Sequence, residues 1–117
     1  MIKRAEELKQ DIKTLFEGKG NVQILHVLDM DQFEGKGRLF ARMTLAPGSS
    51  IGFHQHNNDF ETYYILKGEG IVNDNGTMTK VTVGDVVYTP NGQTHSIEND
   101  SDSTCDLEFM ALILFNS

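Results

Sequence analysis

The sequence is poor in cysteine, in proline and in positive charge. Cys105 is the only cysteine, so no disulfide can form within the chain. Only two prolines stand against 11 glycines, and Asn-Gly pairs and many β-branched residues accompany them, which favours strands joined by tight turns. The chain has ten Lys and Arg residues and 17 Asp and Glu residues, and the resulting net charge of −7 repels phosphate backbones and anionic lipid surfaces. We therefore expect no nucleic-acid partner and no membrane partner.

Long apolar runs are also missing. No stretch of the 117 residues is apolar enough for a membrane span, and the first residues, 1–7, lack the apolar core of a signal peptide. The length suits one compact domain, and 38% hydrophobic residues are typical of an ordinary folded protein. The sequence thus predicts a single domain, residues 1–117, located in the cytoplasm.

One segment, residues 2–17, has the period of an amphipathic helix. Its apolar residues recur at spacings of three and four, which places them on one helical face. They are Ala5, Leu8, Ile12, Leu15 and Phe16. Gly18 and Gly20 follow and are suited to end a helix. We therefore predict an N-terminal helix within residues 1–20.

From Asn21 onward the hydrophobic period changes to two, which indicates β-strands. Nine strands are predicted, at residues 22–29, 38–45, 50–56, 61–67, 70–73, 77–83, 86–89, 95–99 and 105–115. Many short strands with regular turns favour a closed barrel or a sandwich, because an open sheet of this size leaves exposed edges. The predicted fold class is all-β, a small barrel with one N-terminal helix.

Three of the four histidines and one glutamate form a candidate metal site. His54 and His56 are two residues apart in a predicted strand, so both imidazoles face the same side. Glu61 starts the next strand, and His95 starts a strand far along the chain. Three nitrogen ligands and one oxygen ligand suit a divalent Mn, Fe, Co, Ni or Zn ion. The alternative is that His54 and His56 are simply solvated or hydrogen-bonded.

The residues around this set have a fixed spacing in two stretches, 48–68 and 84–99. The specified positions, in order, are Gly48, His54, His56, Glu61 and Gly68, then Gly84, Pro90, Gly92, His95 and Asn99. Both stretches resemble the two signature motifs of the cupin superfamily. The resemblance implies a small double-stranded β-helix, or jelly-roll, barrel that holds a divalent metal inside on His54, His56, Glu61 and His95. The short single-domain layout is most similar to the oxalate decarboxylase-like group.

Three further residues are candidates for catalysis. Tyr63 shares the face of Glu61 and is expected to line the cavity. His26 shares an apolar strand face and is either a buried, hydrogen-bonded residue or a substrate contact. Arg42 either faces a substrate carboxylate or lies exposed on a barrel strand. Cys105 is interpreted as a small core residue rather than a nucleophile.

Four protein ligands in an octahedral field leave two positions open, so the expected ligand is a small molecule with adjacent oxygen donors. We predict an enzyme of the dioxygenase or decarboxylase type, although no general base is evident beyond Tyr63, His26 or hydroxide on the metal. The alternative is a non-catalytic binding protein or sensor. The metal, the substrate and the reaction are left open.

The apolar residues of the predicted helix and of residues 105–115 exceed what one face of a small barrel can bury. We therefore predict a homodimer. The competing interpretation is that the helix folds back over its own barrel.

Overall fold

The computed structural model describes residues 1–116. Strands dominate it, in agreement with the all-β prediction. Two short 3₁₀ turns and ten strands follow one another in the order η1 (Ala5–Glu7), β1 (Gln10–Lys13), β2 (Val22–His26), η2 (Met30–Phe33), β3 (Gly37–Leu45), β4 (Ser50–Gln55), β5 (Asp59–Lys67), β6 (Glu69–Asp74), β7 (Thr77–Thr82), β8 (Val86–Thr89), β9 (Thr94–Glu98) and β10 (Leu107–Phe115).

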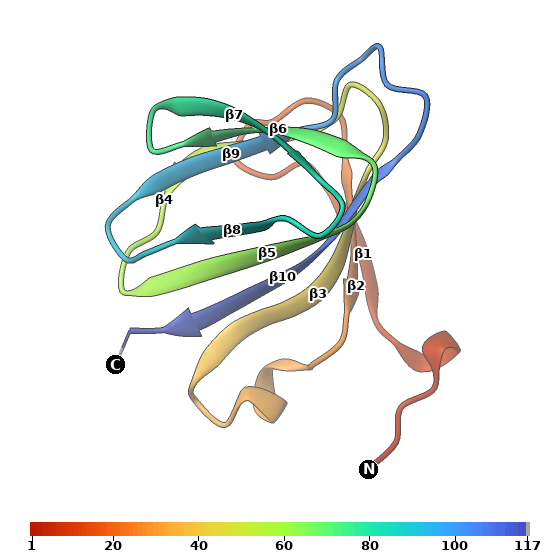
Figure 1. The fold of residues 1–117 in the computed structure, drawn as a ribbon. Coiled ribbons are helices and arrows are strands. Elements are labelled where there is room, and N and C mark those ends of the chain that lie inside the picture. The colour runs from red at the N-terminus through yellow and green to blue at the C-terminus, as the bar shows by residue number, and fades with distance from the viewer. Residues whose placement is uncertain (117) are drawn as a thin grey trace.

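The strands form two antiparallel sheets that face each other across one core (Figure 1). The larger sheet has the strand order β1-β2-β3-β10-β5-β8, and the smaller has the order β4-β9-β6-β7. Residues that alternate along each strand point inward, as expected for sheets with one buried face. The largest apolar side chains between the sheets are Tyr63, Phe109, Met43, Leu45, Ile65, Ile97 and Leu107. The core therefore lies where the jelly-roll prediction requires it.

The predicted N-terminal helix is wrong. Only Ala5–Glu7 is helical, as a single 3₁₀ turn, and Gln10–Lys13 forms strand β1 instead. β1 pairs with β2, from Gln10 opposite Leu25 to Lys13 opposite Val22. Ile12 and Phe16 are 62% and 55% exposed while Leu15 packs against the core, so the apolar residues do not form one buried face. The helical spacing was outweighed by the backbone hydrogen bonds that β1 supplies to the otherwise open edge of β2.

The nine predicted strands are all present, with boundaries that differ by a few residues. The largest difference is at β2, which ends at His26 rather than at Asp29. No helix among residues 1–116 is long and apolar enough to cross a membrane.

The segment 15–19 that follows β1 packs closely against β4. The Leu15 carbonyl accepts hydrogen bonds from the Gly18 and Gly52 amides, at 3.0 and 3.1 Å. A Cβ atom on Gly52 would lie 1.8 Å from the Phe16 carbonyl oxygen, so only glycine permits this approach. The segment therefore has a fixed position beside the strand that carries His54.

Candidate metal centre

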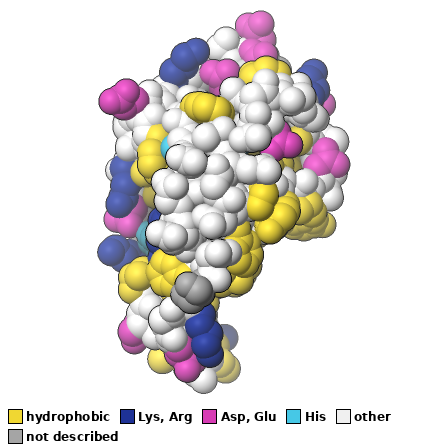
Figure 2. Space-filling view, turned by 90° about the vertical axis from the view of Figure 1, so that its left-hand side faces the viewer, with side chains coloured by type: hydrophobic (Ala, Val, Ile, Leu, Met, Phe, Trp, Pro, Cys, Tyr) yellow, Lys and Arg dark blue, Asp and Glu magenta, His cyan; other side chains and the backbone are white. Residues whose placement is uncertain are grey.

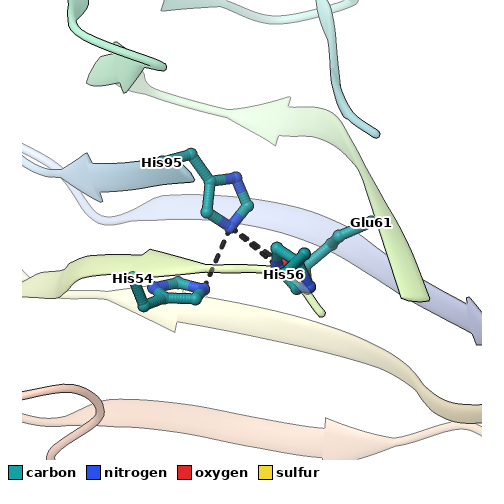
Figure 3. A group of neighbouring side chains, drawn as sticks. All are labelled: His54, His56, Glu61 and His95. Carbon is teal, nitrogen blue, oxygen red and sulfur yellow. Dashed lines mark hydrogen bonds and ion pairs between the residues drawn. The ribbon is translucent and has the colours of Figure 1, made fainter. Parts of the chain in front are cut away.

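The side chains of His54, His56, Glu61 and His95 point toward one another between the two sheets (Figure 3). One ligand atom from each residue lies within 4.8 Å of all the others. Nε2 of His95 is 3.0 Å from Nε2 of both His54 and His56, and Oε1 of Glu61 is 3.0 Å from Nε2 of His56. The four residues predicted from the sequence thus lie together.

Strand pairing explains this convergence. His54 on β4 is directly opposite His95 on β9 in the smaller sheet. His56 follows the end of β4, where its backbone bonds to Gln93 and Gly92 at 3.0 and 2.8 Å. Glu61 comes from β5 in the larger sheet. The site therefore joins the two sheets at one end of the barrel.

Each imidazole is oriented by a partner on its Nδ1 atom. Nδ1 of His54 donates to the Gly52 carbonyl at 2.7 Å, because a carbonyl oxygen can only accept. Nδ1 of His56 donates to Oδ1 of Asp59 at 2.7 Å, and Nδ1 of His95 lies 2.7 Å from Oγ1 of Thr89. These bonds leave the Nε2 atoms to face the centre.

The donor set fits a cation. With Nδ1 protonated, neutral His54 and His56 each present an Nε2 lone pair, and Glu61 adds carboxylate oxygens. Acceptor atoms 3.0 Å apart repel one another unless a proton or a metal ion lies between them. All four side chains are at least half-buried, and His95 is fully buried. Three imidazole nitrogens and one carboxylate are a suitable ligand set for a divalent transition metal.

Asp59 is held in turn by Arg38. Nε of Arg38 donates to Oδ2 of Asp59 at 3.0 Å, while the Asp59 side chain is only 7% exposed. Arg38 lies at a register shift, since Leu114 of β10 pairs with Gly37 and Ile113 pairs with Leu39. Such a bulge redirects a side chain that would otherwise follow the strand's alternation. The bulge therefore gives Asp59 a cationic partner.

The hydrogen bonds within the cluster change the pKa values of its members. Burial alone would raise the pKa of Glu61, but hydrogen bonds with His56 and His95 lower it. Burial would lower the pKa of His56, but hydrogen bonds with Glu61 and Asp59 raise it. Burial lowers the pKa of His54. Glu61 is therefore ionised and His54 neutral near pH 7, as metal ligation requires.

A cavity of about 210 Å³ lies beside the cluster. Tyr63 lines it, as predicted, and His26 lines it as well. Tyr63 stacks on His95 with ring centroids 5.2 Å apart, and burial, with Glu61 nearby, raises its pKa. Nε2 of His26 lies 2.8 Å from Oδ2 of Asp11. The remaining lining residues are Lys13, Leu15, Phe16, Ile24, Arg38, Leu39, Met43, Ile51, His54, His56, Glu61 and Ile113.

The structure decides between the two alternatives for Arg42 and shows that the interpretation of Cys105 is wrong. Arg42 does not line this cavity; it pairs with Glu108 on the outer face of the larger sheet, because β3 residues alternate in orientation there. The structure thus supports its alternative as an exposed strand residue. Cys105 is exposed rather than in the core, because it lies in the turn before β10.

Three functional contacts were missed by sequence reasoning. Asp59 and Thr89 orient two of the histidines, and the ring of Phe16 stacks on His54 with centroids 3.8 Å apart. Thr89 reaches the site because β8 pairs it with Glu61, a register that the sequence does not reveal. The contact of Asp59 with His56 could have been predicted from the sequence, since Asp59 is three residues after His56 in a turn.

The family model for the cupin domain matches residues 41–113, which include all four candidate ligands. This chain belongs to the cupin family. The cupin is 46% identical over 115 residues to the oxalate-binding protein of Thermotoga maritima, covering 97% of this chain and 93% of that protein. It also superposes on the crystal structure of a predicted oxalate decarboxylase from Thermotoga maritima with a TM-score of 0.90 and 45% identity, over 98% and 99% of the two chains.

A more distant structure shares only the fold with this cupin. The polyketide cyclase of Streptomyces resistomycificus superposes with a TM-score of 0.78 at 17% identity, over 100% of this chain and 81% of the cyclase. The jelly-roll architecture therefore persists across large sequence differences and does not by itself define an activity.

Proposed function

We propose that this cupin binds one divalent transition-metal ion on His54, His56, Glu61 and His95 and, with it, a small oxygen-chelating anion such as oxalate. The observation that carries the proposal is the convergence of three Nε2 atoms and one carboxylate oxygen at about 3 Å, with each Nδ1 already engaged. When bound, the ion would supply Lewis acidity toward the oxygen atoms of the ligand.

The charges around the cavity favour an anion. Lys13 and Arg38 line it, whereas Glu61 is the only carboxylate that lines it within residues 1–116. The Arg38 guanidinium uses Nε for Asp59 and has no other ion-pair partner within residues 1–116. Lys13 and Arg38 thus place two cationic groups at this cavity, on a protein with a net charge of −7.

The size of the cavity supports a small ligand. About 210 Å³ is below the roughly 300–1,000 Å³ of pockets for drug-sized molecules. Oxalate is a compact dianion with adjacent oxygen donors, and the 46% identical relative carries the name oxalate-binding protein. Both observations support oxalate as the first ligand to test.

Catalysis is the second candidate function, and it would be of the decarboxylase or dioxygenase type. It is favoured by Tyr63 and His26, which both line the cavity with protonatable side chains. The raised pKa of Tyr63 keeps its hydroxyl protonated and able to donate a hydrogen bond. The Asp11 carboxylate contacts Nε2 of His26, and contacts of this kind orient the catalytic histidines of enzymes. Binding is the better supported function because, in the part of the chain that the structure describes, no carboxylate besides Glu61 lines the cavity to act as acid or base.

The decisive experiment is calorimetry of oxalate binding to metal-free protein and to protein loaded separately with Mn, Fe, Co, Ni or Zn. We expect oxalate to bind only the metal-loaded forms, and the complex to melt at a higher temperature. Oxygen uptake and the release of carbon dioxide and formate are followed in the same samples. Oxalate recovered unchanged supports binding alone, whereas its consumption supports the enzyme. Absence of metal binding by every ion would contradict the proposal.

We also propose that the cupin forms a homodimer through the outer face of β5 and β8. β8 is an edge strand of the larger sheet, and four large apolar side chains on these two strands are exposed. They are Tyr64, Leu66, Val86 and Tyr88, exposed by 39% to 60%. Figure 2 shows several hydrophobic side chains next to one another at about mid-height on the face that it draws. Apolar surface that gathers on an otherwise polar protein is typical of an interface.

A further inference from the structure

The ring of Phe16 forms part of the cavity wall next to a candidate metal ligand. It stacks face to face on His54, with an angle of 8° between the ring planes and 3.8 Å between the centroids. Phe16 lines the cavity and is nevertheless 55% exposed. An aromatic residue that exposes more than half of its surface is poorly placed to stabilise a core. Its position therefore needs another explanation than packing.

The backbone at Phe16 is in an unfavourable conformation. Its φ is 53°, and that of Glu17 is 57°, so two consecutive side-chain-bearing residues adopt the left-handed region. For a bulky residue this conformation is a genuine outlier, and it persists only where the surrounding structure enforces it. Such strain is typical of functional sites. The chain therefore adopts an unfavourable backbone conformation at the residue that places an aromatic ring at this point.

Gly52 connects this segment to the metal site. Its amide donates to the Leu15 carbonyl at 3.1 Å, and its own carbonyl accepts the hydrogen bond from Nδ1 of His54 at 2.7 Å. The hydrogen bonds of one residue therefore fix both the segment that carries Phe16 and the orientation of His54. The ring and the imidazole are held as one unit at the mouth of the cavity.

We propose that Phe16 determines which ligands enter the site: it holds the His54 ring in place and closes the cavity to chelating anions larger than short dicarboxylates such as oxalate and malonate. The inference rests on the proposed function, because it concerns the ligand of the same site. With a smaller residue at position 16, the wall beside His54 opens and a bulky chelating dicarboxylate can reach the ligand site. A rigid aromatic wall excludes by steric overlap, so its removal should change the affinity for large ligands more than for small ones.

The test compares oxalate with phthalate, which carries the same charge on a much larger frame, in zinc-saturated protein. We expect Phe16→Ala to raise phthalate affinity by at least about tenfold and to change oxalate affinity by less than about threefold. Phe16→Asn is the second variant, because asparagine tolerates a positive φ and should fold without the strain. Phe16→Tyr keeps an aromatic ring at this position and should therefore retain the selectivity of the natural protein.

The matched control is Phe53→Ala. Phe53 is 53% exposed and is adjacent to His54, but it does not line the cavity. This variant should therefore keep the selectivity of the natural protein. A readout that needs no metal is the His54 proton resonance, which should shift in Phe16→Asn as the ring current is lost, while His26 stays unchanged.

The outcomes separate the two proposals. A natural protein that binds neither zinc nor oxalate overturns the proposed function and this inference together. A natural protein that binds both, with Phe16 variants that prefer oxalate over phthalate to the same degree, overturns the role of Phe16 alone. Equal effects in Phe53→Ala also overturn it, because they would show a general effect of losing an exposed aromatic ring.

Discussion

One carboxylate oxygen of Asp59 lies 2.7 Å from Nδ1 of His56, and it makes Asp59 the acceptor that fixes the tautomer of a candidate metal ligand. A carboxylate in this position orients the ring and increases the basicity of the atom that binds the ion. The contact is almost fully buried on both sides, with exposures of 2% and 7%. Solvent therefore does little to weaken it.

Replacing this carboxylate should weaken metal binding without removing a ligand. We expect Asp59→Asn to lower zinc affinity by about 10- to 100-fold, the usual effect of losing such a partner. Competition with a chromophoric chelator measures the change. Asp31→Asn is the control, because it removes the same charge from an exposed position. Equal affinities in Asp59→Asn and the natural protein would show that the contact does not support the site.

Removal of a ligand should separate metal binding from folding. His56→Ala should abolish stoichiometric metal binding while the circular dichroism of the sheets persists, because the core is formed by apolar residues of both sheets. The variant removes one of the two partners of Asp59 and of Glu61, which keep Arg38 and His95, so its free energy of unfolding should fall by about 1–3 kcal/mol. Metal analysis and denaturant titration measure the two effects. His26→Ala is the control and should keep its metal; loss of metal there would show that the ligand set is wrong.

Metal affinity should depend on pH through the histidines. A metal ion binds only the neutral imidazole, so protons compete with it as the pH falls below about 6.5. Burial would lower the pKa of His56, but hydrogen bonds with Glu61 and Asp59 raise it above that of a free imidazole. Protons therefore compete with the metal ion for His56 already at a higher pH. Zinc affinity should therefore rise between pH 6 and pH 8 and level off above. Calorimetry at several pH values tests this, and a flat profile would contradict histidine ligation.

The proposed homodimer predicts a mass near twice 13.1 kDa by light scattering at micromolar concentration. Introducing charge at its apolar face should dissociate it, so the double variant Tyr64→Lys and Tyr88→Lys is expected to be monomeric. Met78→Lys is the control, since Met78 is 62% exposed on β7 of the other sheet. A natural protein of monomeric mass would contradict the proposal, as would dissociation in the control alone.

The sequence was sufficient for the strands and for the four residues of the cluster because both depend on local patterns. Period-two alternation identifies strands, and two histidines two residues apart share a face wherever the strand runs. The fixed spacing within residues 48–68 and 84–99 was sufficient to identify the resemblance to the cupin family. The exception is His95, which was a candidate from its residue type but whose place opposite His54 is a contact between distant segments that only the resemblance implied.

The failures arose where tertiary contacts overrule local pattern. Residues 10–13 carry a helical spacing, yet their backbone pairs with β2 because that strand would otherwise have an open edge. Arg42 and Arg38 are four residues apart on β3, but only Arg38 sits at a bulge that redirects it to Asp59. A bulge depends on the register with β10, which no local pattern encodes.

Two imidazoles from the smaller sheet, a third just past the end of β4 and one carboxylate from the larger sheet make up the cluster, so its geometry exists only once both sheets have come together. If the proposed function holds, folding would precede metal binding, and the bound ion would be one that the surroundings supply at that moment. Sites of mixed nitrogen and oxygen ligands rank divalent metals by the general order of complex stability rather than by biological need. The metal found in protein from an overexpressing host thus reports the composition of the growth medium as much as the natural partner of the site.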